Sequence, residues 1–379
     1  MVDFSKIPSA CYVLEEAKLR KNLELMHHVQ DAAGVDIILA FKGFSMWGAF
    51  PLVKQYLKGA TASSLHEAKL CYEEMGTHAH TYCVAYQEKE IKEIATLSSH
   101  LTFNSLTQLE QFGDMVERYN PQISLGIRVN PEWSDVTTDL YNPSSPTSRL
   151  GMTADHFGDH LPENVSGLHF HVLCESTSYA LEKVLEALGE KFAPQLREAS
   201  WVNMGGGHLM TREGYDVDHL IRILKEFKAK WDVEVILEPG SAVAWQTGDL
   251  VTTVLDIVEN GGVQTAIIDA SFTCHMPDCL EMPYKPKITG AHSEAISGKP
   301  TYRIGGLSCL AGDFMEAYSF DRPLSIGDQL IFEDMIHYTM VKTSTFNGVP
   351  HPSIGIWKED GSFKLLREFG YEDYKNKLS

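Results

Sequence analysis

Short apolar segments alternate eight times with helix-length stretches in the first two-thirds of the chain, and this alternation limits the possible folds most. The segments rich in β-branched and apolar residues predict strands at 36–41, 59–64, 79–84, 100–103, 122–129, 165–171, 200–204 and 233–238. The stretches between them place apolar residues on one helical face, as in Leu65–Met75, Glu88–Leu97, Leu106–Tyr119, Ala180–Glu198 and Val217–Lys230. Eight such alternations predict an α/β fold of the (β/α)8 TIM-like barrel type, with a doubly wound open sheet as the alternative.

After about residue 245 the pattern changes to strands without helices between them. These strands are expected at 250–258, 263–270, 301–306, 328–333, 337–343, 352–357 and 362–366. Regular Gly, Pro and Asp turns are typical of a mainly antiparallel β-barrel or sandwich domain. The segment 10–14 precedes the first barrel helix and is expected to join this sheet. We therefore predict a cofactor-binding barrel over 15–245 and a β-domain made of 1–14 and 246–379.

The charge and the cysteines limit the partners that we expect. A net charge of −19 over 379 residues argues against nucleic acid or an anionic membrane, since both are bound mainly through Lys and Arg. It would favour a small cationic substrate, although such a charge also serves solubility alone. No segment is apolar enough to span a bilayer, and Met1–Pro8 lacks the features of a signal peptide. Seven cysteines without metal-type spacing predict reduced thiols, no zinc site and a cytoplasmic protein.

Reactive side chains follow several of the expected barrel strands, at the end where barrel enzymes carry their active sites. Lys42 leaves the first strand, where partial desolvation would lower the pKa of its amine and favour Schiff-base formation. His169 and His171 alternate, so in a strand both face the same side, where a neutral imidazole could stack on a flat ring. The alternatives are a solvated lysine and a pair of core histidines; as metal ligands the histidines lack a recognised motif.

A triple glycine and a carboxylate close the last two expected strands. Without a Cβ, Gly205, Gly206 and Gly207 would allow backbone N–H groups to approach a phosphate, although they also fit a simple tight turn. A GxGxxG dinucleotide motif is absent from this place. Glu238 on the next strand could hold a proton on a ring nitrogen and make that ring an electron sink, or could pair with a nearby Arg or Lys. Together they suggest a phosphorylated heteroaromatic cofactor.

A segment of small residues in the β-domain carries Cys309 and Asp313. The thiol could act as a proton donor, and the carboxylate could hold a positively charged group. A lone cysteine is more often structural.

The order of these signals resembles the fold-type III pyridoxal-phosphate decarboxylases, which are relatives of alanine racemase and include the ornithine and diaminopimelate decarboxylases. The resemblance covers nearly the whole chain and rests on Lys42, Phe170–Val172, Gly205–Gly207, Glu238–Gly240, Ser308–Asp313, Tyr338-Thr339 and Ser344–Gly348. Within that group, the stretches 169–175, 273–278 with 280–284, and 309–313 are most similar to carboxynorspermidine/carboxyspermidine decarboxylases. Diaminopimelate decarboxylases carry an acidic residue directly after the cysteine, where this chain has Leu310.

The resemblance implies a role for each of these residues. Lys42 would bind pyridoxal 5′-phosphate covalently, His171 would stack on its ring, and Glu238 would contact the ring nitrogen. The phosphate would be held by the three glycines Gly205, Gly206 and Gly207, with a hydroxyl from Tyr338. No metal is expected.

The family also implies a homodimer with shared active sites. Cys309 would come from the other subunit and protonate the substrate carbon after CO₂ leaves, while Asp278 and Asp313 are predicted to hold amines of a polyamine-like substrate. One residue departs from the family pattern: Ser241 follows Glu-Pro-Gly, where relatives carry an acidic residue or an arginine.

The predicted function is therefore decarboxylation of carboxynorspermidine or carboxyspermidine in polyamine biosynthesis. The alternatives are a decarboxylase of diaminopimelate, arginine or ornithine, and a catalytically inactive homologue that binds a partner. The joint presence of Lys42, His171, Glu238 and Cys309 argues against the inactive homologue. The two substrates differ by one methylene, which changes binding by only about 1–3 kcal/mol, so both are predicted substrates.

Overall fold

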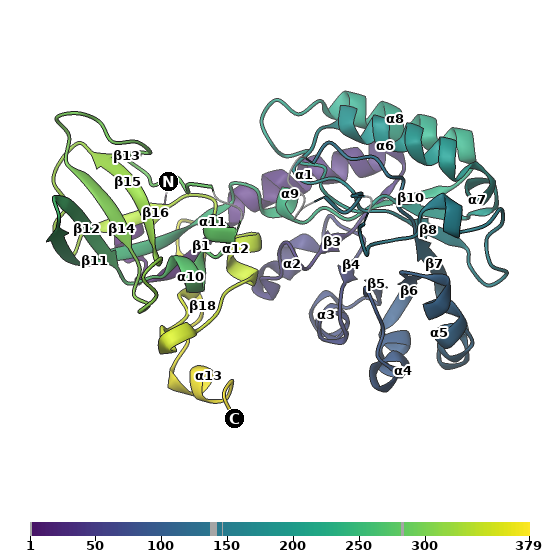
Figure 1. Cartoon of the computed structure of the whole chain (residues 1–379), viewed down its shortest axis with the longest axis horizontal. Helices are drawn as coiled ribbons and strands as arrows, with labels where there is room; N and C mark the ends of the chain where they lie inside the picture. The colour runs from purple at the N-terminus through teal and green to yellow at the C-terminus, as the bar shows by residue number, and fades with distance from the viewer. Residues whose placement is uncertain (1, 137–141, 146, 282–283) are drawn as a thin grey trace. The chain divides into compact units, whose positions relative to one another are not determined.

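The computed structural model describes residues 2–136, 142–145, 147–281 and 284–379. Its contacts divide the chain into two compact units, which we describe separately. The barrel unit is Arg20–Val243, and the β-unit combines Met1–Leu19 with Ala244–Ser379. Figure 1 labels the helices and strands of both units. The predicted domain limits at residues 15 and 245 stay a prediction.

A parallel sheet forms the centre of the barrel unit, and its two edge strands are almost continuous in sequence. The strand order is β2-β10-β9-β8-β7-β6-β5-β4-β3. The strands are β2 (Asp36–Ile37), β3 (Leu39–Ala40), β4 (Ala60–Ala62), β5 (Ala79–Tyr82), β6 (Ser98–Phe103), β7 (Ser124–Arg128), β8 (Gly167–His169), β9 (Trp201–Asn203) and β10 (Glu234–Leu237). Ile38 N–H donates to Leu237 O at 2.9 Å, and Leu39 N–H donates to Gly59 O at 2.9 Å. The segment 36–40 thus pairs on both sides and nearly closes the sheet, which confirms the predicted barrel.

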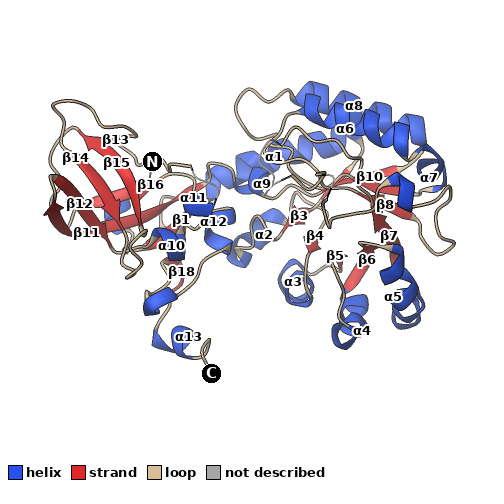
Figure 2. Cartoon of the chain, viewed as in Figure 1, coloured by secondary structure: helices blue, strands red, loops and turns tan. Residues whose placement is uncertain are grey.

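Helices between the strands lie on the outside of this sheet, as Figure 2 shows. Several begin at a polar cap: the side chains of Ser64, Ser105 and Asp216 each accept the N–H of the residue three positions on. The helices of the chain up to this point are α1 (Glu16–Ala33), α2 (Phe50–Val53), α3 (Leu65–Leu70), α4 (Glu88–Leu97), α5 (Leu106–Tyr119), α6 (Ser178–Lys191), α7 (Ala193–Glu198), α8 (Val217–Trp231) and α9 (Ser241–Ala244).

Two predicted helices differ from the structure in detail. The stretch expected at Ala180–Glu198 is broken between α6 and α7, because Pro194 occupies the first turn of α7 and Phe192 leaves helical geometry. The stretch expected at Leu65–Met75 continues α3 as a π-helical turn over Cys71–Met75.

Trp201 fills the inside of the barrel beneath the carboxyl ends of the strands. Its side chain is 4% exposed, and its indole N–H donates to Ser124 Oγ at 2.8 Å. A Cβ at Gly126 or Gly167 would lie 2.4 Å or 2.0 Å from the indole ring. The two glycines on neighbouring strands therefore make room for one large side chain.

The β-unit is a mixed, mostly antiparallel sheet. Its path is β13-β15-β14-β12-β11-β1-β17-β18, and β16 pairs with β11. The strands are β1 (Cys11–Glu15), β11 (Gly248–Asn260), β12 (Val263–Ile268), β13 (Ala291–His292), β14 (Thr301–Gly305), β15 (Phe314–Phe320), β16 (Gln329–Phe332), β17 (Ser353–Trp357) and β18 (Phe363–Arg367). β1 lies antiparallel to β11 and parallel to β17, so the N-terminal segment is an internal strand of this sheet. Short helices follow at α10 (Phe272–His275), α11 (Asp278–Glu281), α12 (Tyr338–Val341) and α13 (Tyr371–Lys375).

The prediction of a strand at 337–343 is wrong, because this segment contains α12. Its alternating, β-branched sequence suits a strand, but Thr339 is buried in a helical turn and Ser344 N–H donates to Cys274 O at 2.8 Å. Tertiary contacts thus override the local preference. The sequence analysis also missed β15, which pairs with β14.

Across the described ranges, no helix combines the length and the apolar character needed to cross a bilayer.

Candidate active site

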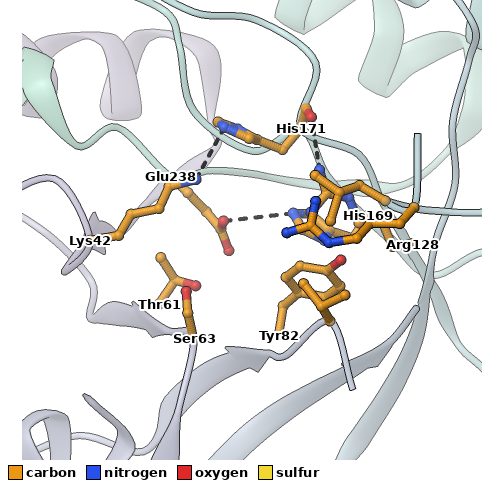
Figure 3. Close-up of a pocket in the computed structure, with 11 residues that line it drawn as sticks. Lys42, Thr61, Ser63, Tyr82, Arg128, His169, His171 and Glu238 are labelled. Carbon is orange, nitrogen blue, oxygen red and sulfur yellow. Dashed lines mark hydrogen bonds and ion pairs between the residues drawn. The ribbon is translucent and has the colours of Figure 1, made fainter. Parts of the chain in front are cut away.

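Lys42, His171 and Glu238 come together in one pocket of the barrel unit, at the carboxyl ends of the strands (Figure 3). The pocket has a volume of about 220 Å³ and is lined by Lys42, Thr61, Ser63, Tyr82, Val84, Arg128, Arg149, Leu150, His169, His171 and Glu238. The turns carrying Lys42 and Glu238 meet closely, since a Cβ on Gly43 would lie 2.6 Å from Gly240 Cα. The three predicted residues from three separate strand ends therefore share one site.

A hydrogen-bond chain fixes the protonation of His171. Gly206 N–H donates to His171 Nδ1 at 2.8 Å, so a neutral ring carries its proton on Nε2. His171 Nε2 lies 3.2 Å from Lys42 Nζ. An Nε2–H group can donate to this nitrogen only when the lysine amine is neutral.

Burial and neighbouring cations favour those neutral forms. Burial lowers the pKa of His171 well below its ordinary value, and the charge of Lys42 adds to this. Solvent reaches Lys42 through the pocket, yet the surrounding protein and then the Arg128 guanidinium lower the pKa of its amine. A lysine with these neighbours is suited to attack a carbonyl carbon.

Glu238 is a carboxylate enclosed by the protein. Its side chain is 11% exposed, and Asn203 Nδ2–H donates to Oε1 at 2.6 Å. Burial raises the pKa of Glu238, and the Asn203 hydrogen bond opposes that rise. The sequence analysis missed Asn203, although a polar residue at the end of a buried strand beside the glycine turn is a usable signal.

Arg128 is a second residue that the sequence analysis missed. Its side chain is 4% exposed, its Nη2 donates to His171 O at 3.0 Å, and its guanidinium carbon lies 4.6 Å from the centre of the Tyr82 ring. An arginine that follows the mainly apolar stretch Leu125–Ile127 within the strand segment 122–129 was the signal for it. Its positive charge lowers the pKa of both Glu238 and Lys42, which favours an ionised carboxylate and a neutral amine.

The triple glycine packs against neighbouring strand ends. A Cβ on Gly205 would lie 2.5 Å from Phe170 O, one on Gly206 would lie 2.3 Å from Glu238 O, and one on Gly207 would lie 2.1 Å from Leu173 O. Gly205 N–H donates to Asn203 Oδ1 at 2.9 Å, and Gly206 N–H is used by His171. Two of the three N–H groups are thus engaged within the protein, and phosphate binding by the glycines stays a prediction.

The other predicted site residues belong to the β-unit. Cys309 is an exposed free thiol, and its backbone N–H donates to Asn347 Oδ1 at 2.8 Å. Asp313 is buried and accepts hydrogen bonds from Ser271 Oγ (2.8 Å), Thr273 N–H (3.1 Å) and Ser308 N–H (3.0 Å). Its carboxylate therefore holds the segment that carries Cys309, and its predicted contact with a substrate amine stays a prediction.

Asp278 already has a cationic partner. Lys342, which the sequence analysis missed, contacts the carboxylates of both Asp278 and Glu281. Burial lowers the pKa of Lys342. The hydrogen bonds to the two carboxylates outweigh this effect and raise the pKa to about 12. A substrate amine that binds Asp278 would share or displace this ammonium group.

Tyr338 and Ser241 each begin a four-residue helix. Tyr338 begins α12, and its predicted phosphate contact stays a prediction. Ser241, the departure from the family pattern, begins α9 directly after the Glu238 turn. Among the residues that the structure describes, no group of three or more His, Cys, Asp or Glu side chains is arranged to hold a metal ion.

Comparisons with known proteins identify the family to which the chain belongs. The chain matches a family described as "Pyridoxal-dependent decarboxylase, C-terminal sheet domain" over residues 11–336. It is 49% identical to a carboxyaminopropylagmatine decarboxylase of Synechocystis, covering 99% of this chain and 96% of that protein. It is 45% identical to a carboxynorspermidine/carboxyspermidine decarboxylase of Campylobacter jejuni, covering 98% of both.

Solved structures show the same fold. The carboxynorspermidine decarboxylase of Campylobacter jejuni, crystallised with norspermidine, is 44% identical and gives a TM-score of 0.91 over 98% of this chain and 100% of that one. A diaminopimelate decarboxylase gives a TM-score of 0.80 at 18% identity, over 99% of this chain and 94% of that one, which is a likeness of fold alone.

Proposed function

The chain belongs to the pyridoxal-dependent decarboxylases, and we propose that it removes CO₂ from the carboxyaminopropyl end of a linear polyamine. The names of its relatives describe substrates that share this end, an α-amino acid joined to an amine chain. They differ only at the far end of the molecule. The proposal is carried by the identity of 45–49% over nearly the whole chain with these enzymes, together with the pocket of Lys42, His171 and Glu238.

The pocket suits pyridoxal 5′-phosphate. Its amine is placed for covalent capture of an aldehyde, its imidazole is neutral, and its carboxylate is enclosed and supported by a donor. When bound, the cofactor supplies a ring that takes up the electrons left behind when CO₂ departs. In this proposal Lys42 holds the cofactor, His171 lies against the face of the ring, and Glu238 keeps a proton at the ring nitrogen.

Cys309 is proposed as the group that returns a proton to the carbon that loses CO₂. The support is its exposed thiol, on a segment held in place by Asp313 and Asn347. We propose that this thiol reaches the barrel of a partner chain in a homodimer. Exposed apolar side chains near it, Leu307, Leu310 and Phe346, support an interface at this segment, since such groups favour burial against a partner.

There are two candidates for the substrate. The first is the pair carboxynorspermidine and carboxyspermidine, and the second is carboxyaminopropylagmatine. The 49% identity to the Synechocystis enzyme favours the second candidate. The far end is an ammonium group in the first two and a guanidinium group in the third. The acidic pair Asp278 and Glu281 has the charge to attract either, and its exposed member Glu281 is the more accessible of the two.

We also propose the cytoplasm as the compartment and no role for nucleic acid. The support is that all seven cysteines are free thiols and that the net charge is −19.

CO₂ release from a substrate panel tests the proposed function. The panel contains the three carboxyaminopropyl amines together with diaminopimelate, ornithine and arginine. We expect kcat/KM for at least one carboxyaminopropyl amine to exceed that for each amino acid by about a hundredfold or more, because the site must pair additional cationic groups. Comparable turnover of diaminopimelate would contradict the proposal, and the ratio of the guanidinium to the ammonium substrates decides between the two candidates.

A further inference from the structure

His169 is a buried imidazole in the pocket with no hydrogen-bond partner among the described residues. Its side chain is 3% exposed, and neither ring nitrogen makes a hydrogen bond within the described part of the chain. Buried polar side chains are nearly always paired, since an unpaired one costs about 1–3 kcal/mol. The unpaired ring therefore points to an interaction that forms only when the site is in use.

Glu238 is the polar group that His169 faces. His169 Nε2 lies 3.7 Å from Glu238 Oε2. Figure 3 marks this pair with a dashed line. The His169 and Tyr82 rings meet edge to face, with their centres 5.2 Å apart. A closure of about 0.7 Å would bring the two atoms to the usual N–H···O distance. The other carboxylate oxygen, Oε1, is already bound by Asn203.

Burial is the main reason why the His169 ring is neutral. Burial, followed by the charges of Arg128 and Lys42, lowers the pKa of His169 well below its ordinary value. A neutral imidazole carries one N–H group. When this hydrogen is on Nε2, it points toward the Glu238 carboxylate. The ring then provides a hydrogen-bond donor without adding a charge.

We propose that His169 is a positioning residue for Glu238, and that its Nε2–H group donates to Oε2 and holds the carboxylate ionised against the ring nitrogen of pyridoxal 5′-phosphate. Asn203 then holds Oε1 and His169 holds Oε2, and the Thr61 hydroxyl adds a further hydrogen bond that lowers the pKa of Glu238. Glu238 needs such support because an enclosed carboxylate tends to take up a proton, and a protonated Glu238 could not stabilise a protonated ring nitrogen. The inference rests on the proposed function, since it requires this cofactor.

The hydrogen bond between His169 and Glu238 can be tested by comparing how tightly two cofactors bind to the apoenzyme. The first is pyridoxal 5′-phosphate, and the second is its 1-deaza analogue, in which a carbon replaces the ring nitrogen. Both can react with Lys42 in the same way, so the ratio of their dissociation constants reports only on the ring nitrogen and the groups that support it. The ratio is measured for the wild type, His169→Leu, His169→Gln and the control His80→Leu, which removes another enclosed imidazole with an unpaired nitrogen.

We expect His169→Leu to reduce the preference for pyridoxal 5′-phosphate by about tenfold, the loss of one hydrogen bond to a charged group. His169→Gln should restore most of the preference because its amide N–H can reach the same oxygen, and His80→Leu should leave it unchanged. An unchanged ratio in a folded His169→Leu variant would overturn the inference, as would a loss in His169→Gln as large as that in His169→Leu.

A measurement on the wild type covers the case in which His169→Leu does not fold. In ¹⁵N NMR of histidine-labelled holoenzyme, with the His169 signal assigned through His169→Gln, we expect the proton on Nε2 and not on Nδ1. A proton on Nδ1 would overturn the inference. If the wild type turns over carboxyaminopropyl amines while either test fails, the proposed function stands without the role of His169; if it binds neither cofactor, both are lost.

Discussion

At the scale of single residues, hydrogen-bond donors favour particular protonation states of His171 and Glu238. The Gly206 N–H group selects the His171 tautomer, and that tautomer matches a neutral Lys42 amine. Asn203 and Arg128 support an ionised Glu238 against the cost of its burial. The identities of Lys42, His171 and Glu238 were predictable because each lies at the end of a strand. Asn203 and Arg128 also leave a signal as polar residues in buried strands, but their partners Glu238 and His171 are identified only when the strands are brought together.

Gly207 offers a residue-scale prediction with a matched control. Gly207 and Gly214 both have positive φ, at 90° and 80°, but a Cβ on Gly207 would lie 2.1 Å from Leu173 O while nothing lies within 4 Å of one on Gly214. Gly214→Ala should cost about 1–2 kcal/mol of unfolding free energy through backbone strain alone. Gly207→Ala should cost about 1–3 kcal/mol more through overlap and should weaken cofactor binding. Urea unfolding measures the free energy of unfolding, and cofactor titration measures the affinity for the cofactor. An equal loss of unfolding free energy in the two variants would show that Gly207 is not needed for close packing.

At the scale of elements, the barrel followed from periodicity. The helices α4 and α5 begin and end where the sequence pattern predicted, since each has an apolar stripe and clear ends. The four-residue helix α12 was not predictable, because so short a turn is set by its buried Thr339 and by neighbouring backbone bonds. Lys342, directly after α12, was missed for the same reason: its partners Asp278 and Glu281 are more than 60 residues earlier in the chain.

The contact between Lys342 and α11 gives an element-scale prediction. If the acidic pair Asp278 and Glu281 attracts the far end of the substrate, Lys342→Met should free these carboxylates and lower KM by about twofold to fivefold, the range of an exposed ion pair. Lys299→Met is the control, because Lys299 pairs with the exposed Asp321 elsewhere in the β-unit. Steady-state kinetics with the preferred substrate measures both. A KM that is equal in the two variants would place the far end of the substrate away from α11.

At the scale of the whole molecule, buried histidines make the fold sensitive to acid. Burial lowers the pKa values of His100, His208 and His275 to about 4, while an unfolded chain has histidines near the ordinary value of 6.5. Between these values the unfolded chain binds protons that the folded chain does not, so stability falls as the pH falls from 6.5 toward 4. Each imidazole contributes about 1.4 kcal/mol per pH unit in that window. Asp249 opposes this trend, because burial raises its pKa to about 6 and its folded form gains a proton first.

This acid sensitivity is testable in the barrel with one variant. His100→Phe keeps a ring beside His80 and Trp201 and removes the titrating group. The free energy of unfolding in urea, measured from pH 7 to pH 5, should fall less steeply in His100→Phe than in the wild type. Parallel pH profiles for the two proteins would show that His100 does not contribute to the loss.

Assembly gives the second prediction at this scale. If Cys309 completes the site of a partner chain, Lys42→Ala and Cys309→Ala should each have little activity, and a mixture of the two should recover about one quarter of the wild-type activity. Half of the dimers formed at random are mixed, and each mixed dimer has one complete site out of two. CO₂ release after unfolding and refolding an equal mixture measures the recovery. No recovery, with dimers present by light scattering, would contradict a shared site.

The central claim is that the barrel pocket holds pyridoxal 5′-phosphate on Lys42. Its most direct test is reduction of the purified holoenzyme with borohydride, followed by peptide mass spectrometry. We predict one cofactor-modified peptide, with the modification on Lys42, and loss of both this peptide and the visible absorbance in Lys42→Ala. Modification of a different lysine, or a Lys42→Ala variant that keeps the absorbance and the turnover of the wild type, would contradict the account.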